Sequence, residues 1–325
     1  MFLGLPYVLA EYRNVEEDTM QQTLVLINPN AASGRAETIW QRMSAHVEAQ
    51  MGALQVVITQ QPDDVARYVD EAQQNGMTHI LAVGGDGTNH ALINALAIRQ
   101  AQHPDEPLPI GGTIPVGTGR DWARTLNIPF KPEAIGTWLA QAQVKQVDIG
   151  LLHYSTDDGQ TCQRYFLNVA SSGLGGEVVA RVNRTRRRRP WTFLKSTVST
   201  LFAYDPIPMR VEVDGDVWYD GDSYIVAVAN GTTFGRGMKV APHAEIQDGL
   251  LDVILVEGMS RFSALKALPS LYNGTHLNHP RVQWRRGKDI KIITSGSLDV
   301  ELDGEYVKGT ALHFSVCPSM LRLLV

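Results

Sequence analysis

Short apolar runs alternate with amphipathic stretches along the chain from residue 23 to about residue 142. Runs of four to eight apolar residues are typical of buried strands, whereas apolar residues three or four positions apart are typical of helices. We expect strands at 24–28, 54–59, 80–83 and 110–115, and helices at 36–50, 62–75, 89–101, 120–126 and 133–142. This repeating series predicts a Rossmann-like, doubly wound α/β sheet, whose ligands gather at the carboxyl ends of its strands.

After residue 144 the pattern changes to short strands separated by turns rich in Gly and Asp. We expect strands at 147–154, 164–169, 209–213, 222–230, 250–256, 289–294, 298–302 and 312–318. Helical stretches at 191–204 and 260–273 interrupt them, and we interpret the apolar stripe at 262–271 as a core face rather than as a lipid pocket. Short strands with turn signals between them predict a second, β-sandwich-like domain.

The change of pattern divides the 325 residues into two domains, as expected for a chain of this length. We expect an α/β domain at 23–146 and a β-rich domain at 147–325. Residues 1–22 show neither pattern, so we expect a disordered leader, whose first 19 residues are a candidate start-site artefact because Met20 precedes the first strand. The sequence contains no run of about 18 apolar residues, which argues against a membrane-spanning helix.

Composition narrows the class of protein further. The formal net charge of −5 gives no support to nucleic-acid binding, which usually needs a basic domain surface. The chain has only two cysteines, far apart in sequence, so we expect neither a disulfide framework nor a cysteine-rich zinc site. A reducing, cytoplasmic compartment is the simplest interpretation.

Two glycine turns carry the clearest chemical signal. The first follows the strand at 80–83 and consists of Gly84, Gly85, Asp86, Gly87 and Thr88; the second, residues 117–121, follows the strand at 110–115. Glycine allows a close approach to a ligand, and the free N–H groups of a helix start attract an anion, so the pair predicts a polyphosphate cradle with Asp86 suited to a metal ion or a water network. Either turn alone would more often be an ordinary connection, and the chain has neither a P-loop nor a dinucleotide-binding fingerprint.

The β-rich half has acidic turns of its own. The Asp-Gly-Glu turn at 303–305 follows the alternating strand at 298–302, and Asp-Gly is commonly a plain hairpin turn, so its function depends on where it points. The loop at 242–250 combines carboxylates with backbone carbonyls. Such a ligand set can hold a hard cation, so a structural Mg²⁺ or Ca²⁺ is an alternative to a plain loop.

Several motifs occur in an order that resembles bacterial diacylglycerol-kinase-like lipid kinases. The resemblance spans nearly everything from residue 23 onward and rests on residues 84–88, 117–124, 168–175, 230–237, 242–253 and 302–305. The Gly-Gly-Asp-Gly-Thr core alone is less specific, because NAD kinases and 6-phosphofructokinases also possess it. The resemblance implies an ATP-dependent kinase that phosphorylates a lipid hydroxyl, with the nucleotide between a Rossmann-like domain and a β-sandwich.

The resemblance also implies roles for individual residues of this chain. Asp303 matches the family's general base, and Glu305 matches its acidic neighbour. A structural Mg²⁺ site is implied at the Asp248 side chain and the backbone carbonyls of Glu245 and Leu250. The final strands are expected to return to the first domain. The positions implied to bind the nucleotide are Thr59, Gly84, Gly85, Asp86, Gly87, Thr88 and Thr118.

The chain departs from the family pattern next to both glycine turns. It has Arg120-Asp121 where the family usually has Asn-Asp, and residues 89–91 are Asn-His-Ala where the family has Asn-Glu shortly after the first turn. Arg120 is a candidate nucleotide contact that would add a charge at the phosphates. Alternatively it points to solvent and Asp121 merely caps the helix. His90 likewise has the alternative of a helix-surface position.

One strongly basic segment runs from Arg184 to Lys195 and places five arginines beside aromatic residues. A solvated loop is one interpretation. Docking on an anionic membrane surface is the other, because basic residues are attracted to anionic lipid and Trp favours the interface. We therefore expect a cytoplasmic protein for which peripheral contact with the inner face of the membrane is an option.

The sequence leaves the substrate and two other functions open. Diacylglycerol, phosphatidylglycerol and a sphingoid base are all compatible with the motifs. A soluble small-molecule kinase resembling NAD kinase is one alternative function, although the arginine segment disfavours it. A nucleotide-binding regulator without turnover is the other, and the retained acidic turn at 303–305 argues against it. The sequence gives no indication of the oligomeric state.

Overall fold

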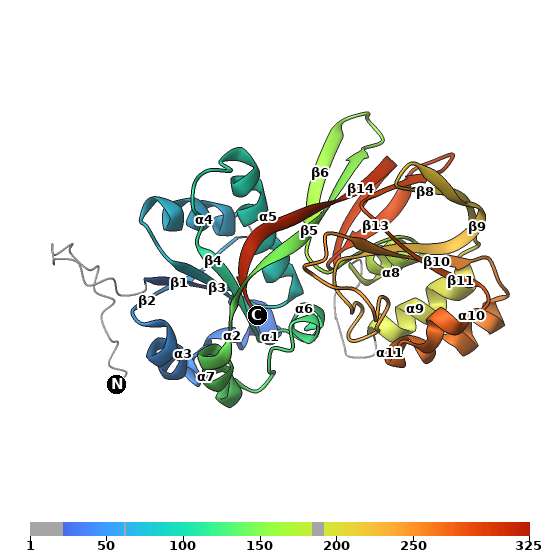
Figure 1. The fold of residues 1–325 in the computed structure, drawn as a ribbon. Coiled ribbons are helices and arrows are strands. Elements are labelled where there is room, and N and C mark those ends of the chain that lie inside the picture. Colours follow the sequence, from blue (N-terminus) through green and yellow to red (C-terminus); the bar gives the residue numbers. More distant parts are fainter. Residues whose placement is uncertain (1–21, 62, 184–191) are drawn as a thin grey trace.

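The computed structural model describes residues 22–61, 63–183 and 192–325, so nearly all of the expected leader at 1–22 lies outside the described residues. The first domain alternates strands and helices (Figure 1). Strands β2, β1, β3 and β4 lie side by side in this order and run parallel, which confirms the Rossmann-like expectation. The elements are β1 (Thr23–Ile27), α1 (Ala31–Gly34), α2 (Ala36–Gln41), α3 (Ser44–Met51), β2 (Leu54–Ile58), α4 (Asp64–Gln74), β3 (His79–Gly84), α5 (Asp86–Gln102), β4 (Ile110–Pro115), α6 (Asp121–Thr125) and α7 (Pro132–Gln141).

Strands β3 and β4 bring the two glycine turns to the same edge of this sheet. Gly84 and Pro115 are paired at the ends of the two strands, so both turns leave the sheet at its carboxyl side. Helix α5 begins at Asp86, three residues before the start expected at residue 89. The Gly-Gly-Asp-Gly-Thr turn is therefore itself the N-terminus of the helix.

The helix expected at 36–50 is two helices, α2 and α3. The chain turns between them at residues 42 and 43, and this break lets Trp40, Met43 and Val47 all become buried. A single straight helix was the wrong prediction, because core packing rather than local propensity decided where the helix ends.

The second domain consists mainly of antiparallel strands, which confirms the expected β-sandwich-like fold. Helix α8 and strand β11 were missed from the sequence. The elements are β5 (Val144–Ser155), β6 (Thr161–Phe166), β7 (Val169–Gly173), α8 (Leu174–Asn183), α9 (Thr192–Ala203), β8 (Ile207–Val213), β9 (Asp216–Ala229), β10 (Leu251–Glu257), α10 (Arg261–Ala267), α11 (Ser270–Asn273), the 3-10 helix η1 (Thr275–Asn278), β11 (Val282–Gly287), β12 (Asp289–Ile293), β13 (Leu298–Leu302) and β14 (Glu305–Leu324).

Two long strands, β5 and β14, connect the domains. They pair antiparallel with each other over most of their length and run from one domain into the other (Figure 1). At its end β14 also pairs with β4 of the first domain, through Leu323 and Gly111. The boundary expected between residues 146 and 147 therefore falls inside β5, and the last strand reaches back to the first domain.

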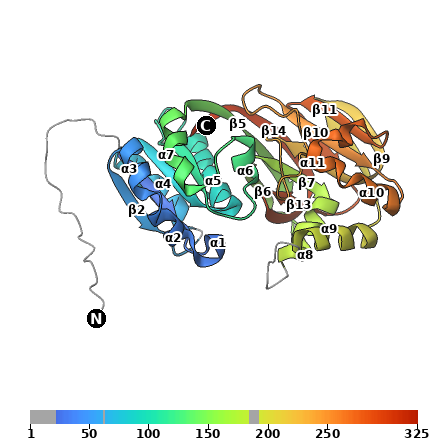
Figure 2. The ribbon, with the colours of Figure 1, turned by 90° about the horizontal axis from the view of Figure 1, so that it is seen from below.

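Helices α8 to α11 form a layer on one side of the β-rich domain (Figure 2). The apolar stripe at 262–271 belongs to this layer, yet no residue of α10 or α11 is buried. Its inner residues line a cavity: Ala264, Ala267, Leu268 and Leu271. The interpretation as a core face is therefore wrong, because this face covers a hollow. No helix of the described residues is long and apolar enough to cross a membrane.

Candidate active site

The two glycine turns touch each other at the carboxyl edge of the sheet. A Cβ atom built on Gly117 would lie 2.5 Å from the Cα of Gly85, so no larger residue fits there unless one turn moves. Thr88 lies beneath the first turn, where its hydroxyl accepts a hydrogen bond from Asn28 Nδ2 at 3.0 Å. Residues of both turns line one cavity, as expected for a shared phosphate cradle.

Asp86 joins the two turns. Its carboxylate accepts hydrogen bonds from the backbone N–H groups of Arg120 (3.0 Å) and Asp121 (3.2 Å), at the start of α6. Burial raises the pKa of this carboxyl group, and the two amides oppose that rise. A carboxylate at free helix amides is a favourable cap. Asp86 therefore stabilises the shape of the cradle, and each of its two carboxylate oxygens accepts a hydrogen bond from one of these amides.

Arg120 packs over the second glycine turn. Its φ of 62° places it in the left-handed region, which Asn tolerates better than Arg. Its Nε donates a hydrogen bond to Gly117 O at 2.6 Å, and its guanidinium carbon lies 4.9 Å from the centre of the Phe130 ring. The alternative that Arg120 points to solvent while Asp121 caps α6 is therefore wrong, because Asp86 supplies the cap. Arg120 lines the cavity.

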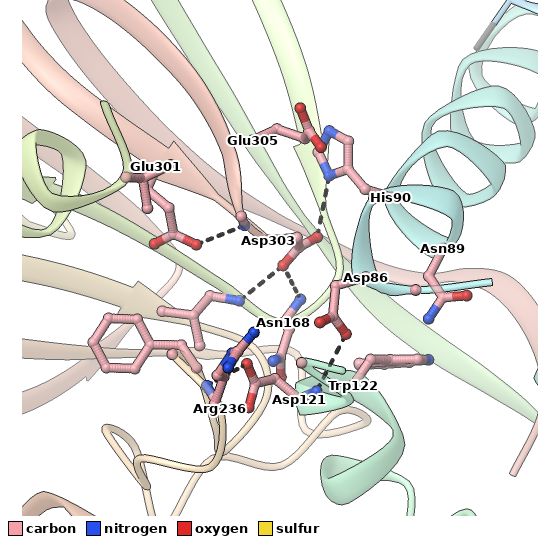
Figure 3. Close-up of a pocket in the computed structure, with 18 of the residues that line it drawn as sticks. Asp86, Asn89, His90, Asp121, Trp122, Asn168, Arg236, Glu301, Asp303 and Glu305 are labelled. Atoms are coloured by element: carbon pink, nitrogen blue, oxygen red, sulfur yellow. Dashed lines mark hydrogen bonds and ion pairs between the residues drawn. The ribbon is translucent and has the colours of Figure 1, made fainter. Parts of the chain in front are cut away.

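The acidic hairpin lies opposite the first glycine turn (Figure 3). Asp303 and Gly304 both have positive φ, 53° and 91°, as in the tight hairpin turns that favour Asp-Gly. The Asp303 carboxylate accepts hydrogen bonds from the backbone amides of residues 167, 168 and 169 at 2.7, 2.9 and 3.1 Å. Glu305 Oε1 lies 3.0 Å from the position that a Cβ on Gly87 would take. The hairpin therefore faces the cradle across the gap between the domains.

His90 is buried, so the helix-surface alternative is wrong. Its ring is 4% exposed, and its Nδ1 lies 3.3 Å from Asp303 Oδ2. Its Nε2 faces the side-chain nitrogen of Asn94 at 3.2 Å. This contact links α5 of the first domain to the acidic hairpin of the second, as Figure 3 shows.

Two further carboxyl groups near the hairpin were missed from the sequence. Asp121 accepts hydrogen bonds from the backbone amides of Arg236 and Gly237 in the second domain, and burial, with the charge of Asp86, raises its pKa to about 7. Burial also raises the pKa of Glu301 to about 8. Glu301 belongs to β13, where strand alternation gives no sign that its side chain turns inward.

A continuous cavity of about 1460 Å³ extends from the glycine turns into the second domain. Its polar end is lined by residues 85–88 of the first turn, residues 117–121 of the second turn and Thr59, whereas Gly84 does not line it. Asp303 and Glu305 also line it. Its other end, which we call the apolar chamber, lies between the sheet and helices α8 to α11 and is lined by Val178, Leu201, Ile225, Met238, Leu268 and Leu271.

The two threonines predicted to bind the nucleotide differ in exposure. Thr59 is buried, and its hydroxyl donates a hydrogen bond to Ile27 O at 3.3 Å. Thr118 is exposed, and its hydroxyl accepts a hydrogen bond from Arg236 Nη2 at 3.2 Å. Thr118 is therefore the more accessible of the two, and Arg236 beside it is a cation that sequence analysis did not single out.

The expected metal loop already contains a cation from the protein. Asp248 Oδ1 accepts a hydrogen bond from Leu250 N at 3.0 Å, and Asp248 Oδ2 lies 3.3 Å from Arg286 Nη1. Arg286 also donates to His243 O. Glu245 is exposed. The guanidinium brings positive charge to Asp248, yet Asp248 Oδ2 is buried and accepts no hydrogen bond. Among the described residues no three His, Cys, Asp or Glu side chains form a metal-binding group. A site built on one carboxylate and two backbone carbonyls needs no such group, so it stays a prediction.

Comparison with known proteins identifies both domains. Residues 22–152 match the diacylglycerol kinase catalytic domain, and residues 168–325 match the YegS C-terminal NAD kinase beta sandwich-like domain. A relative from Xanthomonas oryzae pv. oryzae, named "Probable lipid kinase YegS-like", is 31% identical over 275 residues, which cover 83% of this chain and 86% of the relative. A protein from Mycobacterium tuberculosis named "Diacylglycerol kinase" is 28% identical over 266 residues, covering 80% of this chain and 81% of that protein.

Solved structures share the fold. The crystal structure of a diacylglycerol kinase from Bacillus anthracis str. Sterne matches with a TM-score of 0.69 and 20% identity, covering 95% of this chain and 98% of that one. Yeast NADH kinase matches more distantly, with a TM-score of 0.50 and 11% identity, covering 94% of this chain and 82% of that one. With two family domains in order and a relative above 30% identity over most of the chain, this protein belongs to the diacylglycerol-kinase-like lipid kinase family.

Proposed function

We propose that this protein transfers the γ-phosphoryl group of ATP to a hydroxyl group of a lipid. One observation carries the proposal: a single cavity joins a glycine-lined polar end to an apolar chamber, and Asp303 lies on its lining. A phosphate donor and a lipid acceptor need these two environments in one continuous space. The names of the relatives, diacylglycerol kinase and lipid kinase, agree with such a pair of substrates.

The polar end suits the triphosphate. Phosphate oxygens are bound well by the free amides of a helix start, and Gly87 lies in the first turn of α5, whereas the amide of Thr88 already donates a hydrogen bond to Gly85 O at 3.0 Å. Arg120 and Arg236 bring positive charge to the lining of the same end. Because ATP is used with Mg²⁺, the metal would arrive with the nucleotide and neutralise part of its charge.

The apolar chamber suits an acyl chain. A buried CH₂ group gains about 0.8 kcal/mol on leaving water, so a hollow lined by aliphatic side chains favours a hydrocarbon ligand. A nucleotide such as NAD has no comparable apolar part, which makes the NAD-kinase-like alternative less suitable. Diacylglycerol, phosphatidylglycerol and a sphingoid base all provide both a hydroxyl group and a chain.

Asp303 is the proposed general base. In phosphoryl transfer, most of the rate acceleration comes from alignment and charge neutralisation, and a carboxylate that takes the acceptor proton adds about 10²–10⁴-fold. Asp303 lies on the tight turn between β13 and β14, where three backbone amides hold its carboxylate. Glu305 extends from the same hairpin toward Gly87 and is proposed to assist at the phosphate side.

We also propose that the helical layer contacts the membrane that supplies the lipid. Most of the basic segment from Arg184 to Lys195 lies outside the described residues. Helix α9, which follows it in sequence, and α10, which packs against α9, carry two exposed aromatic side chains. Phe262 is 70% exposed and Phe202 is 40% exposed, and their rings are in edge contact with centroids 6.0 Å apart. Aromatic residues beside basic ones favour an anionic lipid interface.

The decisive experiment is incubation with γ-labelled ATP and Mg²⁺ in three parallel reactions, with a lipid extract, with NAD, or without acceptor. We expect label in a lipid product only. Asp303→Asn should abolish turnover while ATP affinity, measured by calorimetry, stays within about threefold, because the base is lost and the glycine turns proposed to bind the nucleotide are unchanged. Labelled NADP would contradict the lipid as acceptor. The absence of a labelled product with any lipid would contradict the lipid kinase activity. An Asp303→Asn rate within tenfold of wild type would contradict the role of Asp303 as the base.

A further inference from the structure

The contact between His90 and Asp303 is a feature of this chain that the family pattern does not explain. His90 stands next to the first glycine turn, in the run where the sequence departs from the family's Asn-Glu. The two side chains are 4% and 7% exposed, and they meet at 3.3 Å across the gap between the domains. A buried histidine therefore contacts the carboxylate that we propose as the base.

Asn94 determines which nitrogen of His90 carries the proton. The Asn94 amide pairs with the backbone of Tyr165: its Oδ1 accepts from Tyr165 N at 3.0 Å, and its Nδ2 donates to Tyr165 O at 2.9 Å. This pairing fixes the orientation of the amide, whose nitrogen also donates to His90 O at 3.0 Å and lies 3.2 Å from His90 Nε2. An amide nitrogen accepts no hydrogen bond, so a proton on Nε2 would face another donor. Nε2 must then be the acceptor, and the proton of the neutral ring is on Nδ1, which donates to Asp303 Oδ2.

Asp303 has no free acceptor position in this arrangement. Its Oδ1 takes the amides of Asn168 and Val169, and its Oδ2 takes the amide of Leu167 and the ring of His90. A carboxylate offers about four lone-pair positions, so all are used. The backbone amides are fixed by the fold, whereas the His90 bond is the longest of the four. A lipid hydroxyl that approaches Asp303 must therefore take the place of His90.

We propose that His90 is a positioning residue for the phosphoryl transfer. As the Nδ1–H tautomer it aligns the Asp303 carboxylate in the empty site and then yields Oδ2 to the lipid hydroxyl. As the hydroxyl oxygen bonds to the γ-phosphorus and the bond to ADP breaks, the hydroxyl proton passes to Asp303, while His90 keeps its own proton. The expected kinetic effects of this inference rest on the proposed function, whereas the expected tautomer of His90 does not depend on it.

Other acidic groups lie around Asp303. Asp86 from α5 and Glu305 from β14 bring acidic groups to the same region, whereas Glu301 from β13, whose pKa burial raises to about 8, keeps its proton below that pH. Like charges disfavour the ionised form of a carboxyl group, so each hydrogen-bond donor that contacts the carboxylate matters for its stability. Loss of the His90 hydrogen bond should therefore leave the Asp303 carboxylate less firmly held, and the pH profile of kcat/KM is the measurement that reports it.

Two substitutions at the same position separate alignment from packing. In His90→Asn an amide nitrogen takes the place of ring Nδ1, two bonds beyond Cβ, so the donor is kept. His90→Phe keeps a ring of similar size and removes the donor. We expect His90→Phe to lower kcat/KM about tenfold and to shift the acid limb of its pH profile upward by about one pH unit, in line with the loss of one charge-assisted hydrogen bond in the empty site. His90→Asn should stay within about threefold of wild type, with its acid limb unshifted.

The tautomer can be read without any substrate. In ¹⁵N-histidine-labelled protein at pH 7.5, the two-bond ¹H–¹⁵N spectrum should show His90 as the neutral Nδ1–H form, with its signals assigned by their loss in His90→Asn. An Nε2–H form would overturn the proposal whatever the enzyme phosphorylates. Equal losses of kcat/KM in both variants, or a His90→Phe enzyme with the wild-type kcat/KM and pH profile, would also overturn it. Absence of lipid phosphorylation by the wild-type enzyme would instead refute the proposed function.

Discussion

Glu301 should make the stability of the protein fall as the pH rises, and Glu301→Gln should remove that trend. The carboxyl group is fully buried, where it accepts hydrogen bonds from Ser171 Oγ at 2.8 Å and Gly304 N at 2.7 Å. Burial raises its pKa from 4.5 to about 8. A glutamine fits the same contacts, because its oxygen can accept from Gly304 and the Ser171 hydroxyl can turn to accept from its amide nitrogen.

The sign and size of the effect follow from the two pKa values. Below about pH 4.5 the Glu301 carboxyl group is protonated in both the folded and the unfolded chain, so its ionisation does not lower the free energy of unfolding. Between 4.5 and about 8 only the unfolded chain loses the proton, and each pH unit lowers the free energy of unfolding by about 1.36 kcal/mol. The full interval corresponds to about 5 kcal/mol, which is an upper bound because the unfolded chain and local relaxation reduce it.

Thermal unfolding measured from pH 5 to pH 8.5 tests this reasoning. The Tm of Glu301→Gln relative to wild type should rise across this range by about 5 °C or more, since 1 kcal/mol corresponds to roughly 2–4 °C in a large domain. Glu305→Gln is the matched control, because this carboxylate belongs to the same hairpin but is exposed, and its Tm difference should show no pH trend. Parallel Tm curves for Glu301→Gln and wild type would refute the argument.

Three further changes test other parts of the structure. Gly117→Ala places a Cβ 2.5 Å from the Cα of Gly85, so it should push the turns apart and lower kcat/KM for ATP about 10²-fold, measured by steady-state kinetics. Leu268→Trp should fill part of the apolar chamber and lower kcat/KM about tenfold for long-chain lipids but less for short-chain ones; an equal loss for both would contradict the chamber as a chain site. Arg286→Met should lower the Tm, with partial recovery in millimolar Mg²⁺, because Asp252 and Asp248 lose their cation. A wild-type Tm that itself rises with Mg²⁺ would show that a metal binds beside Arg286.

Much of the candidate site could be predicted because it depends on local backbone requirements. Glycine turns at strand ends need particular residues at consecutive positions, and the carboxyl edge of a parallel sheet brings neighbouring turns together. The Asp-Gly turn at 303–305 was also predictable as a hairpin. Its position opposite the cradle was not, because that depends on the pairing of β13 with β7 and β14.

The errors concern faces that only packing defines. An apolar stripe looks the same whether it covers a core or a hollow, and for the stripe at 262–271 the layer of helices leaves the apolar chamber beneath it. Arg286 is distant in sequence from the loop at 242–250, so the residues of the loop give no sign that the guanidinium of Arg286 lies beside Asp248. A helix-surface position was one alternative for His90, because the sequence of α5 alone gives no sign that β6 packs against this helix.

The sequence by itself determined the two-domain α/β and β-rich architecture, the glycine cradle and the acidic turn, because each depends on periodicity or on residues adjacent in the chain. Only the tertiary structure decided that His90 meets Asp303, that Glu301 is buried and that one cavity joins a polar end to an apolar chamber. These features arise where segments far apart in sequence meet, and there the removal of water from charged and apolar groups determines the chemistry.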